Sequence, residues 1–232
     1  MTTVTVTARV VKEHAERRSE ILDAGQALFY EKGYEKTSVA NILEVVGIAK
    51  GTFYHYFDSK EDLLDQIIER QSGRIDGIIA PIAEHSTLPA IEKFNQFFLT
   101  VGHYKASNKA VMMMLTKVLY AEENIKLLHK MSRHRKRVVA PKLAMIISQG
   151  VSEGVFGVDS ALYAAEMILE MGNSLGDEFG RIVLEEELDD LHKQQYLERC
   201  EAYDRAAARI LGAREGSLCI FDRAVLETFF EE

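Results

Sequence analysis

The segment GIAKGTFYHYFDSK, residues 47–60, constrains the fold most because two helix boundaries enclose it. The residues before it have the three-and-four spacing of one helix face: Val39, Ile42, Leu43 and Val46. Gly47 follows them at the position where a left-handed residue ends a helix. Asp58 and Ser59 supply N-cap oxygens for another helix, whose apolar stripe covers residues 63–68. The sequence therefore predicts a short third element between two helices.

That element can form only about two helical turns, which are too short to be stable alone. Phe53 and Phe57 lie four residues apart and share one face, so we expect both rings to anchor the helix in a core. The outer face would then carry Lys50, Gly51, Thr52, Tyr54, His55 and Tyr56. Lysine neutralises phosphate charge, hydroxyls donate to phosphate oxygens, and glycine lets a backbone approach a groove edge. The segment predicts a recognition helix, although Tyr54 and Tyr56 would also suit core rings with solvated hydroxyls.

The run AKGTFYHYFDSKEDLL, with the helix and glycine turn before it, resembles the DNA-binding motif of the TetR (tetracycline repressor) family. Residues 17–38, RRSEILDAGQALFYEKGYEKTS, are similar to that family's first helix and its entry into the second. Residues 149–169, QGVSEGVFGVDSALYAAEMIL, resemble its turn between the seventh and eighth helices. The resemblance implies an all-α fold, with an N-terminal three-helix helix-turn-helix DNA-binding domain followed by a larger helical ligand-binding and dimerisation domain.

The same resemblance implies roles for eight residues at a DNA interface. Those expected at base edges are Lys50, Gly51, Thr52 and His55, and those expected at phosphates are Thr37, Tyr54, Tyr56 and Lys60, with exchange between the two groups left open. Lys60 would begin a helix whose N-terminal dipole attracts phosphate. We expect a flexible arm over residues 1–15, the helix-turn-helix domain over 16–60, and the effector-binding and dimerisation domain over 61–232.

Composition and charge fit a soluble protein of two parts. A chain of 232 residues, 47% of them hydrophobic, can form two small domains, and no apolar run has the length of a membrane span. Residues 1–57 carry seven basic and seven acidic side chains, so the net charge of −8 lies entirely in residues 58–232. An acidic body would turn the neutral N-terminal part toward a duplex. Cys200 and Cys219 have no metal or redox spacing, so we expect both to be reduced in a cytoplasmic protein. We expect no cofactor and no membrane partner.

Helical periodicity continues through the body of the chain. The expected helices cover about residues 59–79, a segment opened by Pro89, and residues 108–120, 123–152, 159–181, 189–212 and 218–230. Pro141 falls inside one of these spans. Because proline removes a backbone hydrogen bond and clashes with the preceding turn, we expect a kink or break near residues 138–140.

Small residues form a stripe on the helix expected over residues 159–181, which permits close approach of another helix. The stripe and the following helix predict a two-fold four-helix bundle between two chains. The interface residues would be Ala165, Ile168, Gly172, Leu175, Gly176, Cys200, Tyr203 and Ala207. Ordinary packing within one chain is the alternative. In the resembling family this helix pair forms the dimer, which would place two recognition helices on a palindromic operator.

Methionines and aromatic residues in the middle of the chain fit either core packing or an adaptable pocket. The pocket candidates are Phe98, His103, Met113, Tyr120, Met167 and Met171. The resemblance implies a repressor that a small, largely apolar effector releases from double-stranded DNA. A DNA-binding protein without effector and an all-helical metal-dependent enzyme are the alternatives. A di-metal bundle needs Glu-x-x-His on two helices, which the sequence lacks, so no catalytic or metal residue is assigned.

Overall fold

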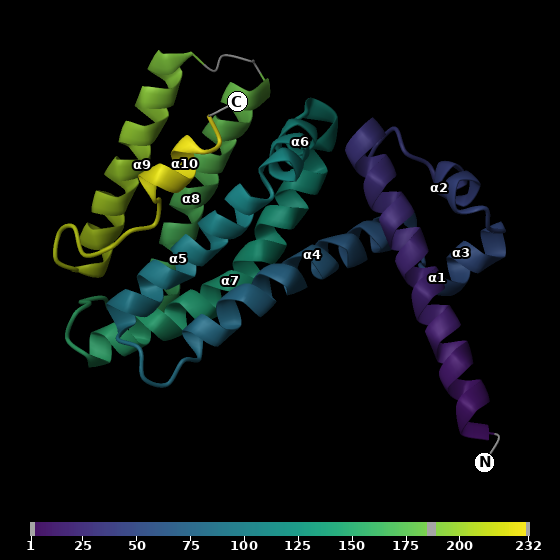
Figure 1. Cartoon of the computed structure of the whole chain (residues 1–232), viewed down its shortest axis with the longest axis horizontal. Helices are drawn as coiled ribbons and strands as arrows, with labels where there is room; N and C mark the ends of the chain where they lie inside the picture. The colour runs from purple at the N-terminus through teal and green to yellow at the C-terminus, as the bar shows by residue number, and fades with distance from the viewer. Residues whose placement is uncertain (1–2, 185–188, 231–232) are drawn as a thin grey trace.

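The computed structural model describes residues 3–184 and 189–230, and within these ranges it contains helices and connecting segments only. The elements are α1 (Thr3–Lys32), α2 (Val39–Val46), α3 (Lys50–Tyr56), α4 (Lys60–Ala83), α5 (Ala90–Ser107), α6 (Lys109–Leu119), the 3-10 helix η1 (Glu122–Asn124), α7 (Ile125–Ser152), α8 (Ala161–Leu184), α9 (Asp190–Leu211) and α10 (Arg223–Glu227). Figure 1 shows α1–α3 at one end, the body α5–α10 at the other, and α4 running between them. The predicted all-α fold is confirmed.

Helices α1, α2 and α3 surround a small core that the first half of α4 completes. The buried residues of this core are Ile21, Leu22, Leu28, Phe29, Ile42, Phe53, Phe57, Leu63, Leu64, Ile67, Ile68 and Leu127. The Ser38 side chain caps α2 by accepting from the Asn41 backbone N–H, and Gly47 ends α2 with φ +71°. The Ser59 hydroxyl caps α4 by accepting from the Asp62 N–H at 3.0 Å. The helix boundaries predicted on either side of α3 are confirmed.

Helix α1 begins at Thr3, so the structure has helix where the sequence predicted a flexible arm over residues 1–15. Extending a helix that already exists adds one hydrogen bond per residue without a new nucleation cost. The residues just before the core segment, KEHAERR (12–18), are mostly good helix formers. The β-branched VTVT run at the start therefore continues a helix that its neighbours have established.

Helices α4 and α7 each run through a proline. Pro81 lies inside α4 and Pro141 inside α7, so α4 continues beyond its expected end and α7 is unbroken where a break was expected. Each proline removes one backbone hydrogen bond, worth about 0.5–1.5 kcal/mol net, and adds a steric clash. Buried side chains flank Pro141 on both sides: Val139, Ala140, Leu143, Ile146 and Ile147. Burial of each large one contributes roughly 1.5–3 kcal/mol, so tertiary packing holds α7 together.

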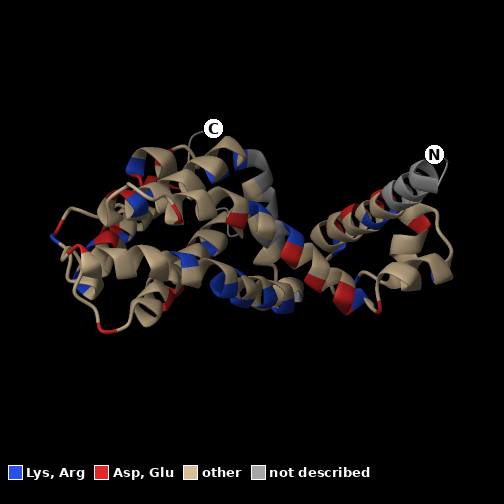
Figure 2. Ribbon diagram, turned by 90° about the horizontal axis from the view of Figure 1, so that it is seen from below, with Lys and Arg blue, Asp and Glu red and all other residues tan. Residues whose placement is uncertain are grey.

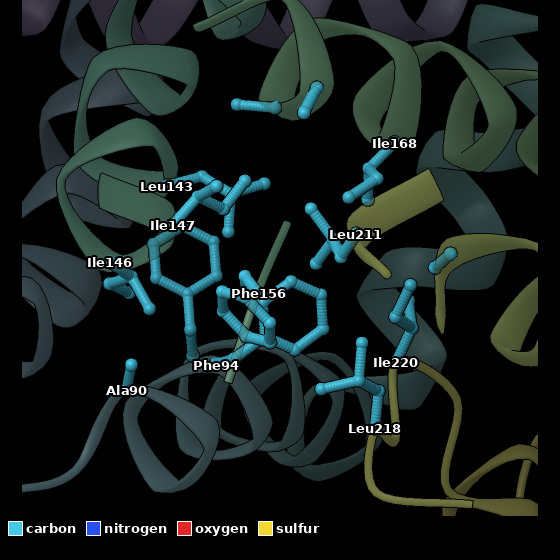
Figure 3. Packing of buried hydrophobic residues seen from close by; sticks show 14 of the residues in the cluster. Ala90, Phe94, Leu143, Ile146, Ile147, Phe156, Ile168, Leu211, Leu218 and Ile220 are labelled. Atoms are coloured by element: carbon cyan, nitrogen blue, oxygen red, sulfur yellow. The ribbon is translucent and has the colours of Figure 1, made fainter. Parts of the chain in front are cut away.

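The core of the body forms where α5, α7, α8 and α9 meet (Figure 3). Phe94 of α5 and Phe156, from the turn after α7, lie at its centre with ring centroids 6.2 Å apart. Phe156 lies so close to Gly150 that a Cβ at position 150 would be 2.0 Å from its ring. Leu211 and Ile220 approach the same cluster from the C-terminal part of the chain. Gly150 is therefore required for the ring to fill this core.

Substitution of Gly150 tests this packing. We expect Gly150→Ala to lower the free energy of unfolding by roughly 1–3 kcal/mol, because the added methyl overpacks the core. A Cβ at Gly77, inside α4, meets no atom within 4 Å. Gly77→Ala should therefore raise the free energy of unfolding by about 0.5–1 kcal/mol through helix propensity. Urea denaturation at one protein concentration measures both changes, and equal effects of the two substitutions would contradict the assignment.

Candidate nucleic-acid interface

Helix α3 is held in the N-terminal domain by two rings. Phe53 and Phe57 are 0% and 1% exposed, with ring centroids 5.6 Å apart. Ala49 provides no side-chain cap at the start of α3, so burial of these rings rather than local capping stabilises the seven-residue helix. The predicted anchoring of this segment by its two phenylalanines is confirmed.

The opposite face of α3 is open to solvent. Lys50, Gly51, Tyr54 and His55 are exposed, while Thr52 and Tyr56 are partly buried. The Lys50 ammonium lies 5.9 Å from the centre of the Tyr54 ring, and the Tyr54 ring packs edge-on against Phe53. A Cβ at Gly51 would meet nothing within 4 Å. This face thus presents a cation, hydroxyl groups and an imidazole around a position that has no side chain.

Helix α1 adds a residue that the sequence analysis missed. The His14 ring lies 4.5 Å from the Tyr56 ring and 5.4 Å from the His55 ring, measured between centroids. Arg18, one turn later, lies 5.9 Å from the Phe57 ring and donates to the Gln66 side chain. The sequence spacing could have indicated this position, because His14 and Arg18 share a helix face with the buried residue Ile21. His14 therefore joins the exposed face of α3.

Thr37 and Lys60 do not point outward as the sequence predicted. Thr37 is 1% exposed, and its hydroxyl lies 2.8 Å from the Gly33 carbonyl oxygen and 3.2 Å from that of Leu28. The Lys60 ammonium donates to the carbonyl oxygens of Tyr34 and Thr37 at 2.8 and 2.9 Å. Carbonyls at a helix end and in the following turn need such donors. The expected phosphate contact of Thr37 is wrong, and Lys60 ties the α1–α2 connection to α4.

Most residues expected at the dimer interface are buried within the single chain. They are Ala165, Ile168, Leu175, Cys200 and Ala207, each 2% exposed or less. Gly172, Gly176 and Tyr203 are partly buried. A Cβ at Gly176 would lie 3.0 Å from the Tyr120 hydroxyl, and one at Gly180 would lie 2.4 Å from the Tyr120 ring. The glycines at 176 and 180 thus make room for a tyrosine of the same chain, and the interface assigned to the buried residues is wrong.

The expected pocket residues do not form one group. Met167 is 51% exposed on the outer face of α8, and His103 is exposed on α5, so neither lines the interior of the chain. Phe98 packs against Phe94, with centroids 5.0 Å apart. Met113, Tyr120 and Met171 are partly buried. Met167 and Ile168 are consecutive residues of α8, yet Ile168 points inward and Met167 outward, a distinction that spacing alone left undecided.

Charged side chains of both signs occur throughout the molecule (Figure 2). Figure 2 shows acidic and basic side chains interspersed along α4 and over the body. In the described ranges, no three His, Cys, Asp or Glu side chains come together in a way that could hold a metal ion. None of the described helices is both long enough and apolar enough to span a bilayer.

Sequence comparison places the N-terminal domain in a known group. Residues 21–67 match the family model described as bacterial regulatory proteins, tetR family. The HTH-type transcriptional repressor KstR2 of Mycobacterium tuberculosis H37Rv is 27% identical over 158 residues, which cover 65% of this chain and 74% of that protein. The HTH-type transcriptional regulator TtgR of Pseudomonas putida is 31% identical over 61 residues, which cover 26% of this chain and 29% of that protein.

Solved structures extend the likeness to the body. A TetR-family transcriptional regulator from Pectobacterium atrosepticum superposes with a TM-score of 0.60 at 16% identity, over 86% of this chain and 96% of that one. The fatty acid degradation regulator FadR from Bacillus halodurans gives a TM-score of 0.58 at 21% identity, over 84% and 94% of the two chains. These likenesses support the fold across both parts of the chain. The family-model match includes α2 and α3 and therefore the exposed face of α3. The chain belongs to the TetR family of transcriptional regulators.

Proposed function

We propose that the protein is a transcriptional repressor that inserts α3 into the major groove of double-stranded DNA. The observation that carries the proposal is the division of α3 into a buried phenylalanine face and an exposed face of Lys50, Tyr54 and His55. In a helix-turn-helix the second helix reads base edges while the first crosses the backbone, which here assigns those roles to α3 and α2. The similar protein KstR2, itself named a repressor, supports the direction of regulation.

Each exposed group has a distinct task in this proposal. Lys50 and His55 donate to base edges or phosphates, and the hydroxyls of Thr52, Tyr54 and Tyr56 donate to phosphate oxygens. Gly51 removes the side chain where the backbone would come nearest the groove. Because the protein carries a net charge of −8, its overall field opposes the approach of a duplex. Contacts through α3 therefore have to provide both attraction and selectivity.

Two substitutions on α3 test the DNA interface. Tyr54→Ala and Lys50→Ala should each weaken binding to a duplex from upstream of the protein's own gene by roughly tenfold, the loss of about 1.4 kcal/mol. If Lys50 contacts a phosphate, its loss should also reduce the slope of log affinity against log salt by about 0.9. Fluorescence anisotropy against a scrambled duplex measures both effects. Lys193→Ala, on α9, is the matched control, and unchanged affinity of both α3 variants would refute the proposed face.

We further propose that two copies pair through an apolar face on α7 and α8. Its members are exposed, large and apolar: Met145, Val151, Leu162, Tyr163 and Met167. Large apolar side chains left in solvent on packed helices favour an interface, and a second copy is the expected occupant because dimeric regulators read palindromic operators. The face lies on the outer side of the helices whose inner sides form the body core. It replaces the interface that the sequence suggested.

Reversal of the apolar character of this face tests the dimer. We expect Met167→Lys to convert the dimer to monomer in sedimentation velocity, because pairing would bury an unpaired ammonium. Leu191, on α9, is also exposed, at 61%, and lies outside the proposed face. Leu191→Lys should leave the dimer intact. If Leu191→Lys gives monomers and Met167→Lys does not, the interface lies on α9 instead.

An effector in the body would act on DNA through α4, which contributes to both cores. Lys130 of α7 pairs with Glu61 and Asp65 of α4 at 2.7 and 2.9 Å. A shift of α7 would therefore displace the start of α4, which directly follows α3. We propose that such a ligand tilts α4 and changes the separation of the two α3 helices in the dimer. We also propose that the regulator acts in the cytoplasm. A DNA-binding protein without effector would bind its operator with an affinity that no small molecule changes.

A further inference from the structure

A cavity lies between the N-terminal domain and the body, at the end of α1. Helices α1 and α6 pack against each other in this region (Figure 1). The cavity measures about 470 Å³, within the range of roughly 300–1,000 Å³ that is typical of sites for small molecules. Residues 30–33 and 36 line it from the N-terminal domain, and Lys117, Ala121 and Asn124 line it from the body. It is separate from the pocket that the sequence predicted inside the body.

Contacts between the two parts of the molecule hold the walls of this cavity in place. The buried side chain of Asn124 accepts a hydrogen bond from the Tyr34 backbone N–H at 2.8 Å. Leu119, which ends α6, packs against the core of the N-terminal domain, and Leu127 of α7 is buried within that core. Lys60 holds the α1–α2 connection from the other side by donating to the Tyr34 carbonyl oxygen at 2.8 Å. The cavity is therefore preformed, as sites for small ligands usually are.

Basic side chains dominate the lining of the cavity. Lys32 ends α1, Lys36 lies in the α1–α2 connection, and Lys117 lies in the last turn of α6. Glu31 is the one carboxylate among the lining residues. All three lysine side chains are exposed, so a ligand can reach them from solvent. The lining thus sets three ammonium groups against one carboxylate, in a chain whose net charge is −8.

Helix ends account for part of this positive charge. Helices α1 and α6 both end beside the cavity, and the carbonyl end of a helix carries about half a negative charge. Together with the Glu31 carboxylate, the two ends offset about two of the three lysine charges. Glu35, next to Lys36 in the chain, adds little because it pairs with Lys126 at 2.7 Å. The cavity therefore keeps about one positive charge, which attracts an anion.

We infer that this cavity binds a small organic phosphate, whose phosphate group bridges Lys36 of the N-terminal domain and Lys117 of the body. A phosphate monoester carries about −1.5 to −2 charges at pH 7 and has three acceptor oxygens, which suits a lining with three ammonium groups. The organic part packs against the partly buried ring of Tyr30. Binding itself needs no DNA, whereas its use to control DNA binding rests on the proposed function.

The first test measures the chemical class of the ligand on the full chain. Isothermal titration calorimetry without DNA compares phenyl phosphate, benzoate and inorganic phosphate at neutral pH and equal ionic strength. Phenyl phosphate should bind one molecule per chain, at least about fivefold more tightly than benzoate, which has less charge, or inorganic phosphate, which has no ring. Absence of phenyl phosphate binding would overturn the inference. Equal affinity for benzoate would indicate a general anion site, and equal affinity for inorganic phosphate a site for the free ion, so either would overturn the assignment to an organic phosphate.

The second test locates the bound phosphate. Lys36→Gln and Lys117→Gln should each weaken phenyl phosphate binding by roughly fivefold or more, because each removes an ammonium group from a different part of the molecule. A loss in only one of the two variants would place the phosphate on one part and overturn the bridge. Lys193→Gln, on α9, is the matched control and should bind like the native chain. Lys50→Gln should also bind normally, and a loss there would place the phosphate at the proposed DNA-binding face instead.

Ligand-free measurements separate this inference from the proposed function. Thermal unfolding checks that each variant folds, and arginine at position 36 or 117, which keeps the charge, should retain binding if a glutamine variant does not fold. Operator affinity without ligand, measured by anisotropy, judges the proposed function. Lys117→Gln should leave that affinity unchanged. A loss as large as that of Lys50→Ala would assign the lysines to DNA contact and overturn the inference.

Discussion

Burial of Phe53 and Phe57 is the interaction on which the DNA-binding end of the protein depends. A helix of seven residues without a side-chain cap has no stability of its own, so α3 exists only where these two rings enter the core beneath it. The same burial fixes the rotation of α3 and decides which side chains reach solvent. The make-up of the proposed DNA-binding face therefore follows from packing: once the rings are placed, helical geometry places Lys50 and Tyr54 outside.

Local chemistry explains why this end could be predicted from the sequence. The caps at Ser38, Gly47 and Ser59 lie within a few residues of the helices they bound, so their effects are readable without tertiary information. Thr37 and Lys60 lie in the same segment but were misplaced, because their partners are carbonyl groups that come close only after folding. The orientation of a side chain cannot be predicted from the local sequence when its neighbours are distant residues.

The body shows the same limit more strongly. Helical periodicity gave most helix spans, yet it could not tell whether the small-residue stripe of α8 meets another chain or its own. The deciding residue is Tyr120, more than fifty positions before Gly176, whose ring occupies the space that the glycines leave. Proline misled for a related reason, since its local cost at Pro141 is smaller than the gain from the buried side chains around it. Tertiary packing overrode local preference in both cases.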